Sequence, residues 1–144
     1  MRVEAGHAAA LRWLQERTGC VLTGTAKAVQ AVDDTGRIRG VVGYDMWTVN
    51  AVQLHMAVDS PIVWRHLLRP ALEYPFLQAG RSVLLGIIPA SNMRSCAMAR
   101  AAGFVESHRV RDGWAVGEDL VVHELRREDW RQSRKAGKCG QGRS

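Results

Sequence analysis

Apolar residues follow two different periods along this chain, and each change of period marks the boundary of a predicted element. Near the N-terminus they recur at helical spacing until Gly19, which predicts a helix over residues 4–17. A weakly alternating segment then meets the turn sequence at 33–36, and a second apolar segment follows it. This pattern predicts a β-hairpin with strands at 27–32 and 37–47.

The rest of the chain alternates between strands and helices. Ser60-Pro61 predicts the start of a helix, because proline suits the first helical position. Pro70 lies inside that helix and removes a backbone hydrogen bond, so we expect a kink or a restart there. The other expected elements are strands at 49–59, 82–88, about 104–111 and about 118–126, with helices at 62–79 and 91–102. This order predicts an α/β fold, in which a mixed, mostly antiparallel sheet is flanked by helices.

Length and composition fit a single domain with its own core. The chain has 144 residues, of which 47% are hydrophobic and 24% charged. Cys20, Cys96 and Cys139 are far apart and not in CxxC spacing, which argues against a disulfide framework and a structural zinc site. No apolar run approaches the ~20 residues that cross a bilayer, and the N-terminus does not read as a secretory signal. We therefore expect a cytoplasmic protein without a membrane partner.

The net charge of +6 is concentrated near the C-terminus. Residues 131–144 contain five basic residues and no acid, so the residues before them carry about +1. This segment is rich in Gly, Ser and Lys and lacks apolar periodicity, which predicts a folded domain over 1–130 and a disordered basic tail over 131–144. A nucleic-acid-binding arm is the alternative interpretation. Because the tail has no aromatic residue on which bases could stack, we do not expect a nucleic-acid partner.

The segment from 83 to 104 carries the most specific pattern. A buried strand leads to Asn92, which can cap a helix, and Gly103-Phe104 ends that helix and opens the next strand. Further motifs follow in the same order as in one known family. With these motifs, residues 25–130 resemble the GNAT acetyltransferases, and in particular the GNAT-like proteins of tailed bacteriophages and prophages. The motifs are Gln53-Leu-His-Met-Ala-Val-Asp59, Tyr74-Pro-Phe76, Ile88-Pro-Ala-Ser-Asn92, Ala102-Gly-Phe104, Arg109-Val-Arg111 and Glu124-Leu-Arg-Arg-Glu-Asp-Trp130.

The resemblance implies the GNAT fold and an N-acetyltransferase that moves the acetyl group of acetyl-CoA to a primary amine. In that family, the pantetheine arm of the cofactor bonds to the backbone of the strand that ends here at Val58, where that strand splays from the strand at 83–88. The pyrophosphate lies at the start of the next helix. The cofactor-binding residues expected by position are Met56, Ala57, Val58, Arg65, His66, Arg69, Asn92 and Ser95.

Two residues are candidates for the chemistry of the acceptor amine. His55 lies beside the expected thioester, and its ordinary pKa suits a base that takes a proton from the amine. Alternatively, its side chain points to the other face of the sheet and packs there. Glu118 lies on the last strand, where such folds often shape the acceptor site, but it can also be an ordinary polar residue of a hairpin. Asn92 can act as a helix cap. Asp59 can either orient the amine or cap the helix that follows Ser60.

The sequence departs from the GNAT pattern at two places. None of the family's pyrophosphate-loop glycines is present after Val58, and Ala99 stands where many GNAT enzymes have a tyrosine that protonates the leaving thiolate. A second hypothesis is therefore a catalytically degenerate GNAT module that binds acyl-CoA or a protein partner without turnover. The expected partners are a small-molecule or protein amine and, as a homodimer, a second copy of the chain.

Overall fold

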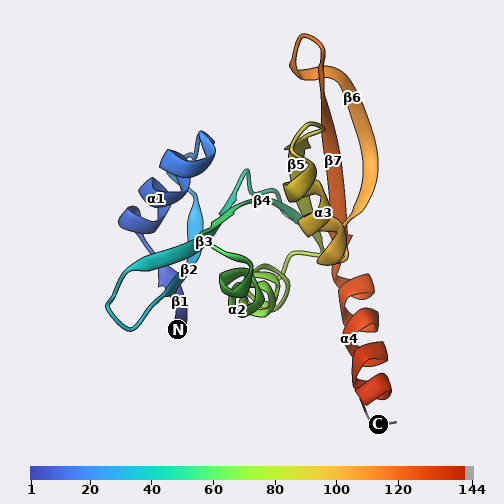
Figure 1. The fold of residues 1–144 in the computed structure, drawn as a ribbon. Helices are drawn as coiled ribbons and strands as arrows, with labels where there is room; N and C mark the ends of the chain where they lie inside the picture. The colour runs from blue at the N-terminus through green and yellow to red at the C-terminus, as the bar shows by residue number, and fades with distance from the viewer. Residues whose placement is uncertain (142–144) are drawn as a thin grey trace. The chain divides into compact units, whose positions relative to one another are not determined.

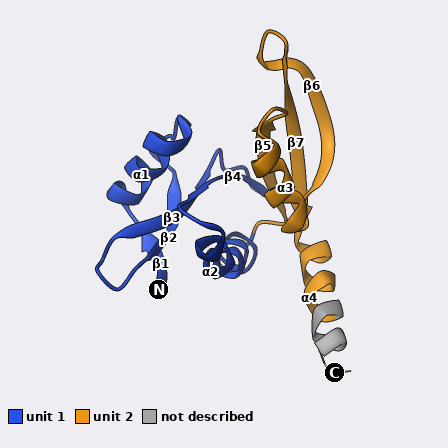
Figure 2. Ribbon diagram, viewed as in Figure 1, with its two compact units in different colours: residues 1–80 blue, residues 81–144 orange. Residues whose placement is uncertain are grey.

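The computed structural model describes the backbone of residues 1–141 and the side chains of residues 1–135 (Figure 1). The chain divides into two compact units, the first over Met1–Gly80 and the second beginning at Arg81 (Figure 2). The elements of the first unit are β1 (Arg2–Gly6), α1 (Ala8–Thr18), β2 (Lys27–Val32), β3 (Ile38–Asp45), β4 (Ala51–Val58), α2 (Pro61–Glu73) and the π-helix η1 (Tyr74–Gln78). Those of the second unit are β5 (Val83–Pro89), α3 (Met93–Ala101), β6 (Val105–Ala115), β7 (Glu118–Arg126) and α4 (Arg127–Gln141).

Strands β1, β2, β3 and β4 of the first unit pair in sequence order, and all three pairings are antiparallel. Helices α1 and α2 cover opposite faces of these strands, as two glycines of β3 show. A Cβ atom on Gly43 would lie 2.5 Å from Leu14 of α1, whereas one on Gly40 would lie 2.7 Å from Val63 of α2. The helices therefore press closely on the strands, and both glycines permit that approach.

The predicted hairpin is confirmed, but the predicted N-terminal helix starts too early. Residues 2–6 form the edge strand β1, in which Gly6 pairs with Ala28 of β2. The helix spans only Ala8–Thr18, and Gly19 follows it with a positive φ of 70°, as the expected left-handed cap. Pairing with β2 gives residues 2–6 hydrogen bonds to another strand, and this long-range effect outweighs the local helical pattern.

The second predicted helix continues through Pro70 as α2, without restarting there. Four of its residues are buried, Val63, Leu67, Ala71 and Leu72, and this apolar face holds the helix on the sheet. The irregularity comes directly after α2, where the backbone widens into η1. There the Ala79 N–H donates to the Tyr74 carbonyl at 2.9 Å.

In the second unit, β7 lies between β5 and β6, and both of its pairings are antiparallel. Strand β6 runs past its predicted end at about 111 and continues to Ala115, and the turn that follows contains Gly117, with φ of 82°. Residues 111–114 form an irregularity in the β6–β7 register between the pairs Val110–Leu120 and Ala115–Glu118. Asp112 and Gly113 thus lie in a bulge inside the ribbon.

The sequence predicts a disordered tail over 131–144, but the structure has a helix as far as residue 141. Helix α4 spans Arg127–Gln141, with Glu128 and Asp129 in its first turn, where acidic residues favour a helix. Trp130 is buried, and the Arg134 guanidinium lies 4.8 Å from the centre of its ring. Residues 142–144 of that segment lie outside the described residues. Within the described part of the chain, no helix is long and apolar enough to span a membrane.

Candidate functional site

Strand β4 turns its side chains alternately toward the two helices of the first unit. Ala57 pairs with Val41 and packs in the core beneath α1. Met56 pairs with Val42, and Val58 lies on the α2 face, where its Cγ1 atom is 3.1 Å from the position of a Cβ on Gly40. The side chains of the predicted residues 56–58 therefore point alternately to the two faces, so any contact along the plane of the sheet would be made by backbone groups.

His55 lies on the α1 face of β4, opposite Gly43 of β3. Its side chain is half-buried, and burial lowers its pKa below the ordinary value of 6.5, while the negative charge of Asp45 acts in the other direction. The lowered pKa keeps the imidazole neutral at neutral pH, which is the protonation state that a base needs.

Asp45 is a fully buried carboxylate that sequence reasoning did not single out. It ends β3 and pairs in register with Gln53 of β4. Its oxygens accept hydrogen bonds from the Thr23 N–H and the Thr23 hydroxyl, both at 2.6 Å, and from the Thr25 hydroxyl at 3.3 Å. Burial raises the pKa of Asp45, but these bonds, together with one from the Met46 N–H, outweigh it and lower the pKa below 3.8.

The charged carboxylate of Asp45 therefore lies next to β4, the strand that carries His55. Its hydrogen-bond partners Thr23 and Thr25 belong to the loop that follows α1. The partners lie 20 and 22 positions earlier in the chain, so no local motif predicts the arrangement. The only sequence signal is the pair of threonines flanking Gly24, which can donate two hydroxyl groups from one short loop.

The polar side chains near the start of α2 differ in whether they already have a partner. Arg65 and His66 are exposed, and no described residue pairs with Arg65. Arg69 lies one turn further along and forms an ion pair with Glu73, with 2.7 Å between Nε and Oε1. Ser60 is the N-cap residue but makes no side-chain cap bond. Arg65 and His66 are thus the better candidates for binding an anion at this helix start.

Asp59 forms ion pairs, and it does not cap α2. Its carboxylate accepts from Arg39 Nε at 2.9 Å and lies 3.8 Å from Arg17 Nε. Arg39 also lies 3.5 Å from Asp33, at the turn between β2 and β3. This network ties the end of β4 to the end of α1 and to the hairpin turn, so we interpret Asp59 as structural.

In the second unit, the predicted residues Asn92, Ser95 and Glu118 gather at the start of α3. Asn92 is the N-cap residue, and its Oδ1 atom accepts the Ser95 N–H at 3.1 Å. The carboxylate of Glu118 accepts the hydroxyl hydrogen bond of Ser91, the residue before Asn92. The interpretation of Asn92 as a helix cap is confirmed. Glu118 is linked to the start of α3 by its hydrogen bond with Ser91.

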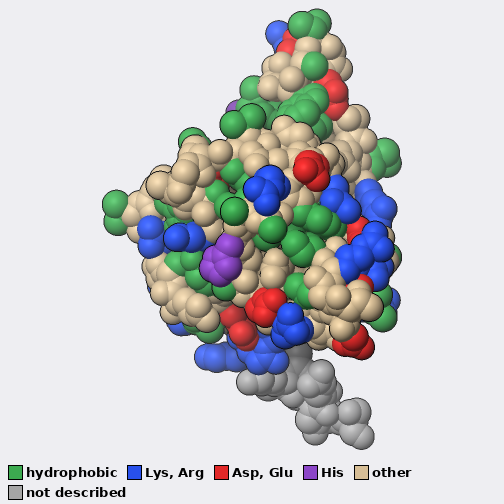
Figure 3. Space-filling model, turned by 90° about the vertical axis from the view of Figure 1, so that its left-hand side faces the viewer, with side chains coloured by type: hydrophobic (Ala, Val, Ile, Leu, Met, Phe, Trp, Pro, Cys, Tyr) green, Lys and Arg blue, Asp and Glu red, His purple; other side chains and the backbone are tan. Residues whose placement is uncertain are grey.

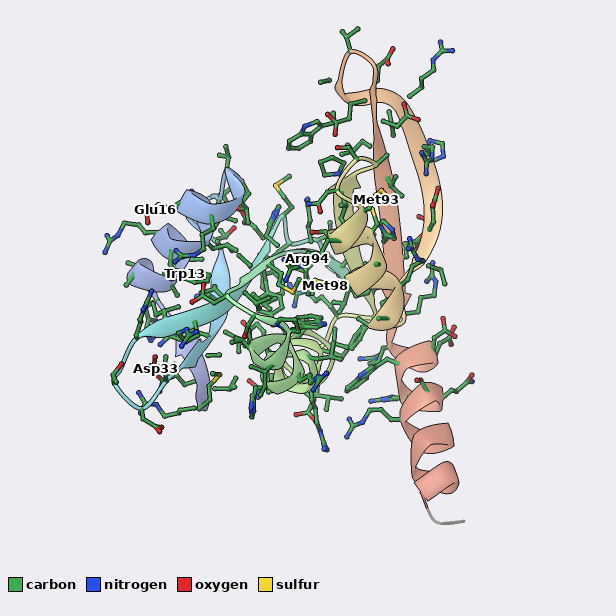
Figure 4. The ribbon with its side chains drawn as sticks, viewed as in Figure 1. Trp13, Glu16, Asp33, Met93, Arg94 and Met98 are labelled. Carbon is green, nitrogen blue, oxygen red and sulfur yellow. The ribbon has the colours of Figure 1, made fainter. Side chains whose placement is uncertain are left out.

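Helix α3 carries further side chains near this end of the unit. Arg94 and Met93 project from its first turn, and Met98 projects from the next turn (Figure 4). Arg94 is exposed and no described residue pairs with it, so it is a further cation that sequence reasoning missed. Ala99, in the position of the family's tyrosine, is half-buried, and its carbonyl accepts the Phe104 N–H at 3.0 Å.

The β6–β7 ribbon beside Glu118 is held by two aspartates. Asp112, at a positive φ of 56°, accepts the Gly117 N–H at 2.9 Å, and its own N–H donates to Asp119 at 3.2 Å. Asp119 also lies 3.7 Å from Arg109. These contacts fix the bulge and leave Trp114 58% exposed next to Ala115, the residue opposite Glu118. Asp119 is therefore a structural residue of the ribbon.

His123 of β7 is a fully buried side chain between the pairing partners Gly86 and Glu106. Among the described residues, neither of its ring nitrogens has a hydrogen-bond partner. A buried polar group without a partner costs about 1–3 kcal/mol, so this histidine weakens the core of the second unit.

Comparison with known proteins finds similar folds among solved structures, all at low sequence identity. No family model matches the chain, and no curated protein matches it. A solved structure of two mutant forms of the spermidine/spermine N-acetyltransferase SpeG from Vibrio cholerae matches with a TM-score of 0.77 and 11% identity, covering 92% of this chain and 98% of that one. SpeG in complex with manganese ions matches with a TM-score of 0.75 and 12% identity, covering 92% and 95%. A dodecameric structure of the spermidine N-acetyltransferase from the same organism matches with a TM-score of 0.72 and 12% identity, covering 90% and 95%. The chain therefore has the GNAT fold, an α/β domain of mostly antiparallel strands flanked by helices.

Proposed function

We propose that this protein is an N-acetyltransferase that moves the acetyl group of acetyl-CoA to a primary amine. The observation that carries the proposal is the match of almost the whole chain to N-acetyltransferase structures, with a TM-score of 0.77. Identity of 11% leaves the acceptor open, and the phage or prophage type stays a prediction. The chemistry must therefore be argued from the residues of this chain.

Acetyl-CoA would supply the activated acetyl group. Its pantetheine arm would contact backbone groups of β4, because the side chains of Met56, Ala57 and Val58 turn to the two faces of the sheet. At the start of α2, Arg65 and His66 are exposed and suit the phosphates. Side chains would thus make the phosphate contacts that loop glycines make in the GNAT pattern.

His55 is the proposed base. The imidazole takes a proton from the incoming ammonium group, so that a neutral amine attacks the thioester carbonyl. Burial keeps His55 neutral, and Asp45 stabilises the imidazolium once the proton has arrived. Glu118 of the second unit, whose carboxylate accepts a hydrogen bond from Ser91, stays a candidate acceptor-site residue by resemblance to the GNAT pattern. The leaving thiolate needs no tyrosine, because a thiolate is a fair leaving group near neutral pH.

The second candidate function is a GNAT module that binds an acyl-CoA or a protein partner without turnover. Two observations favour it: Ala99 offers no proton donor, and the start of α2 has no glycine.

The match to a dodecameric enzyme, together with the exposed edge strand β6, supports the separate proposal that copies of this chain associate. Light scattering coupled to gel filtration measures the number of copies.

Calorimetry with acetyl-CoA and a thiol-release assay with an amine panel separate the two functions. The panel holds a polyamine, a free amino acid and a peptide with a free N-terminus. We expect binding of acetyl-CoA and release of thiol with at least one amine, and a lower kcat for His55→Gln. His7→Gln is the matched control, because His7 is an exposed histidine before α1.

Each outcome decides between the candidates. Binding without thiol release in the presence of any amine would favour the module without turnover. Absence of binding at millimolar acetyl-CoA would reject the enzyme. Equal kcat values for His55→Gln and the parent protein would keep the enzyme but remove His55 from its chemistry.

A further inference from the structure

A basic cavity lies in the second unit where α4 leaves the sheet. Its volume is about 470 Å³, and it is lined by the end of β7, the residue before β5 and one side of α4. Four cations line it, Arg126, Arg127, Arg131 and Lys135, against a single carboxylate, that of Glu128. The remaining lining residues, Ser82 and Gln132, are polar. No residue proposed for acetyl transfer belongs to this set.

The helical form of α4 orders these cations. Arg127, Arg131 and Lys135 follow each other at intervals of four, so they recur along one side of the helix about 6 Å apart. The buried ring of Trp130 fixes the rotation of the helix about its axis. A segment without secondary structure would instead scatter the same charges, which is why the sequence supported a nucleic-acid-binding arm only as the alternative interpretation.

The four cations differ in whether they already bind another side chain. Arg126 lies 3.3 Å from Glu124, and Arg127 donates to the Ser82 hydroxyl at 3.4 Å. Arg131 and Lys135 are exposed, and among the described residues no acidic side chain pairs with either of them. Two unneutralised positive charges one helical turn apart repel each other, and an anionic ligand would relieve this repulsion.

The cavity is separate from the proposed acetyl-transfer residues of the same unit. Ser82 precedes β5, whereas Asn92 follows the other end of that strand. Seven residues of extended strand span about 20 Å, so the two places lie at opposite ends of β5. By contrast, the face of the molecule on the α1 side mixes cationic, anionic and apolar side chains (Figure 3).

We propose that this cavity, through Arg131 and Lys135, binds the phosphate backbone of a nucleic acid without reading its sequence. A small-molecule pocket has mainly apolar walls, whereas every lining residue here is polar or charged. Arg, Lys, Ser and Gln side chains are those that contact nucleic-acid phosphates and set position rather than specificity. The one aromatic residue of α4 with a described side chain is buried, so no platform for base stacking is present there.

Fluorescence anisotropy of the full chain with a labelled DNA duplex of about 20 base pairs tests the proposal, at about 50 mM and 200 mM salt. The test variant is Arg131→Gln with Lys135→Gln. The matched control is Arg12→Gln with Arg100→Gln, which removes the same charge from exposed positions on α1 and α3. We expect the test variant to lose about tenfold or more in affinity, and its salt slope to fall by about 1.8, because each phosphate contact contributes about 0.9.

Three outcomes would overturn the proposal. The parent protein could fail to bind DNA at low salt, or the control could weaken as much as the test variant, which would show a dependence on net charge alone. Inorganic pyrophosphate could also bind as tightly as DNA and with the same loss in the test variant, which would show a site for a small anion. Acetyl-CoA binding of the test variant, measured in parallel, should equal that of the parent.

Discussion

Asp45 is a buried carboxylate at the end of β3, and Asp45→Asn would remove its charge while keeping its size. The amide oxygen of asparagine can still accept the Thr23 N–H. The two threonine hydroxyls can rotate and accept from its NH₂ group, because a hydroxyl is both donor and acceptor. The substitution therefore separates the effect of the charge from that of the hydrogen bonds.

The effect on stability follows from the hydrogen bonds that Asp45 accepts. A hydrogen bond to a charged group contributes about 1.5–3 kcal/mol and a neutral one about 0.5–1.5 kcal/mol. Asp45→Asn should then lower the free energy of unfolding by about 1–3 kcal/mol at neutral pH. Asp45→Ala should lower it by about 3–5 kcal/mol, because it leaves the Thr23 N–H without its acceptor. Urea denaturation measures both values.

The pH dependence has a definite sign. Because the folded protein lowers the pKa of Asp45 below 3.8, its charge stabilises the fold fully above that value, and the stabilisation is lost as the pH falls through the lowered pKa. The difference between the parent and Asp45→Asn should therefore be constant at neutral pH and shrink below pH 3.8. A difference that persists unchanged in acid would mean that packing, and not charge, causes it.

The same variant tests the coupling to His55. The Asp45 charge acts to raise the pKa of His55, so Asp45→Asn should lower that pKa further, and the acidic limb of kcat/KM should move to lower pH. NMR titration of the imidazole measures the change directly. Asp59→Asn is the control, because Asp59 is held by Arg39 at the other end of β4. An unchanged or raised His55 midpoint in Asp45→Asn would refute the reasoning.

Three further variants test other parts of the structure. Arg65→Ala should weaken coenzyme A binding by about 1–3 kcal/mol in calorimetry, whereas Arg69→Ala should not, because Arg69 is already paired with Glu73; equal effects would contradict this assignment. His123→Leu should raise the free energy of unfolding, measured in urea, by about 1–3 kcal/mol, because it removes two buried nitrogens without partners. A lower free energy of unfolding would show that these nitrogens have a partner. Truncation after Trp130 should keep the fold and acetyl-CoA binding but abolish DNA binding, and a large fall in Tm would show that the rest of α4 packs on the unit.

Local chemistry in the sequence was enough to place several features. The hairpin turn at 33–36 is encoded within its own residues: Asp33 accepts the Thr35 and Arg37 N–H groups, and Gly36 takes a φ of 86°. The cap of α3 is encoded in the same way by Asn92 and Ser95. Each of these depends on groups a few residues apart, so the pattern of residue types predicts it directly.

The candidate catalytic residues could be predicted from the sequence only through their positions in the expected strands. Strand alternation places His55 on one face of β4, but which helix covers that face follows from the packing of Leu14 against Gly43. Asp45 was not found at all, because its partner Thr23 lies 22 positions away. A site built from distant segments leaves no short motif.

The sequence by itself determined the order of the hairpin, the central helices and most strands, since apolar periodicity and capping residues act within one or two turns of chain. Only the tertiary structure decided that residues 2–6 form β1 and that the basic segment continues as α4. In both cases the local pattern was weak, and contacts with distant residues supplied the missing free energy. For β1 these are the hydrogen bonds to β2, and for α4 they come from the burial of Trp130, which turns a run of charges into an ordered surface.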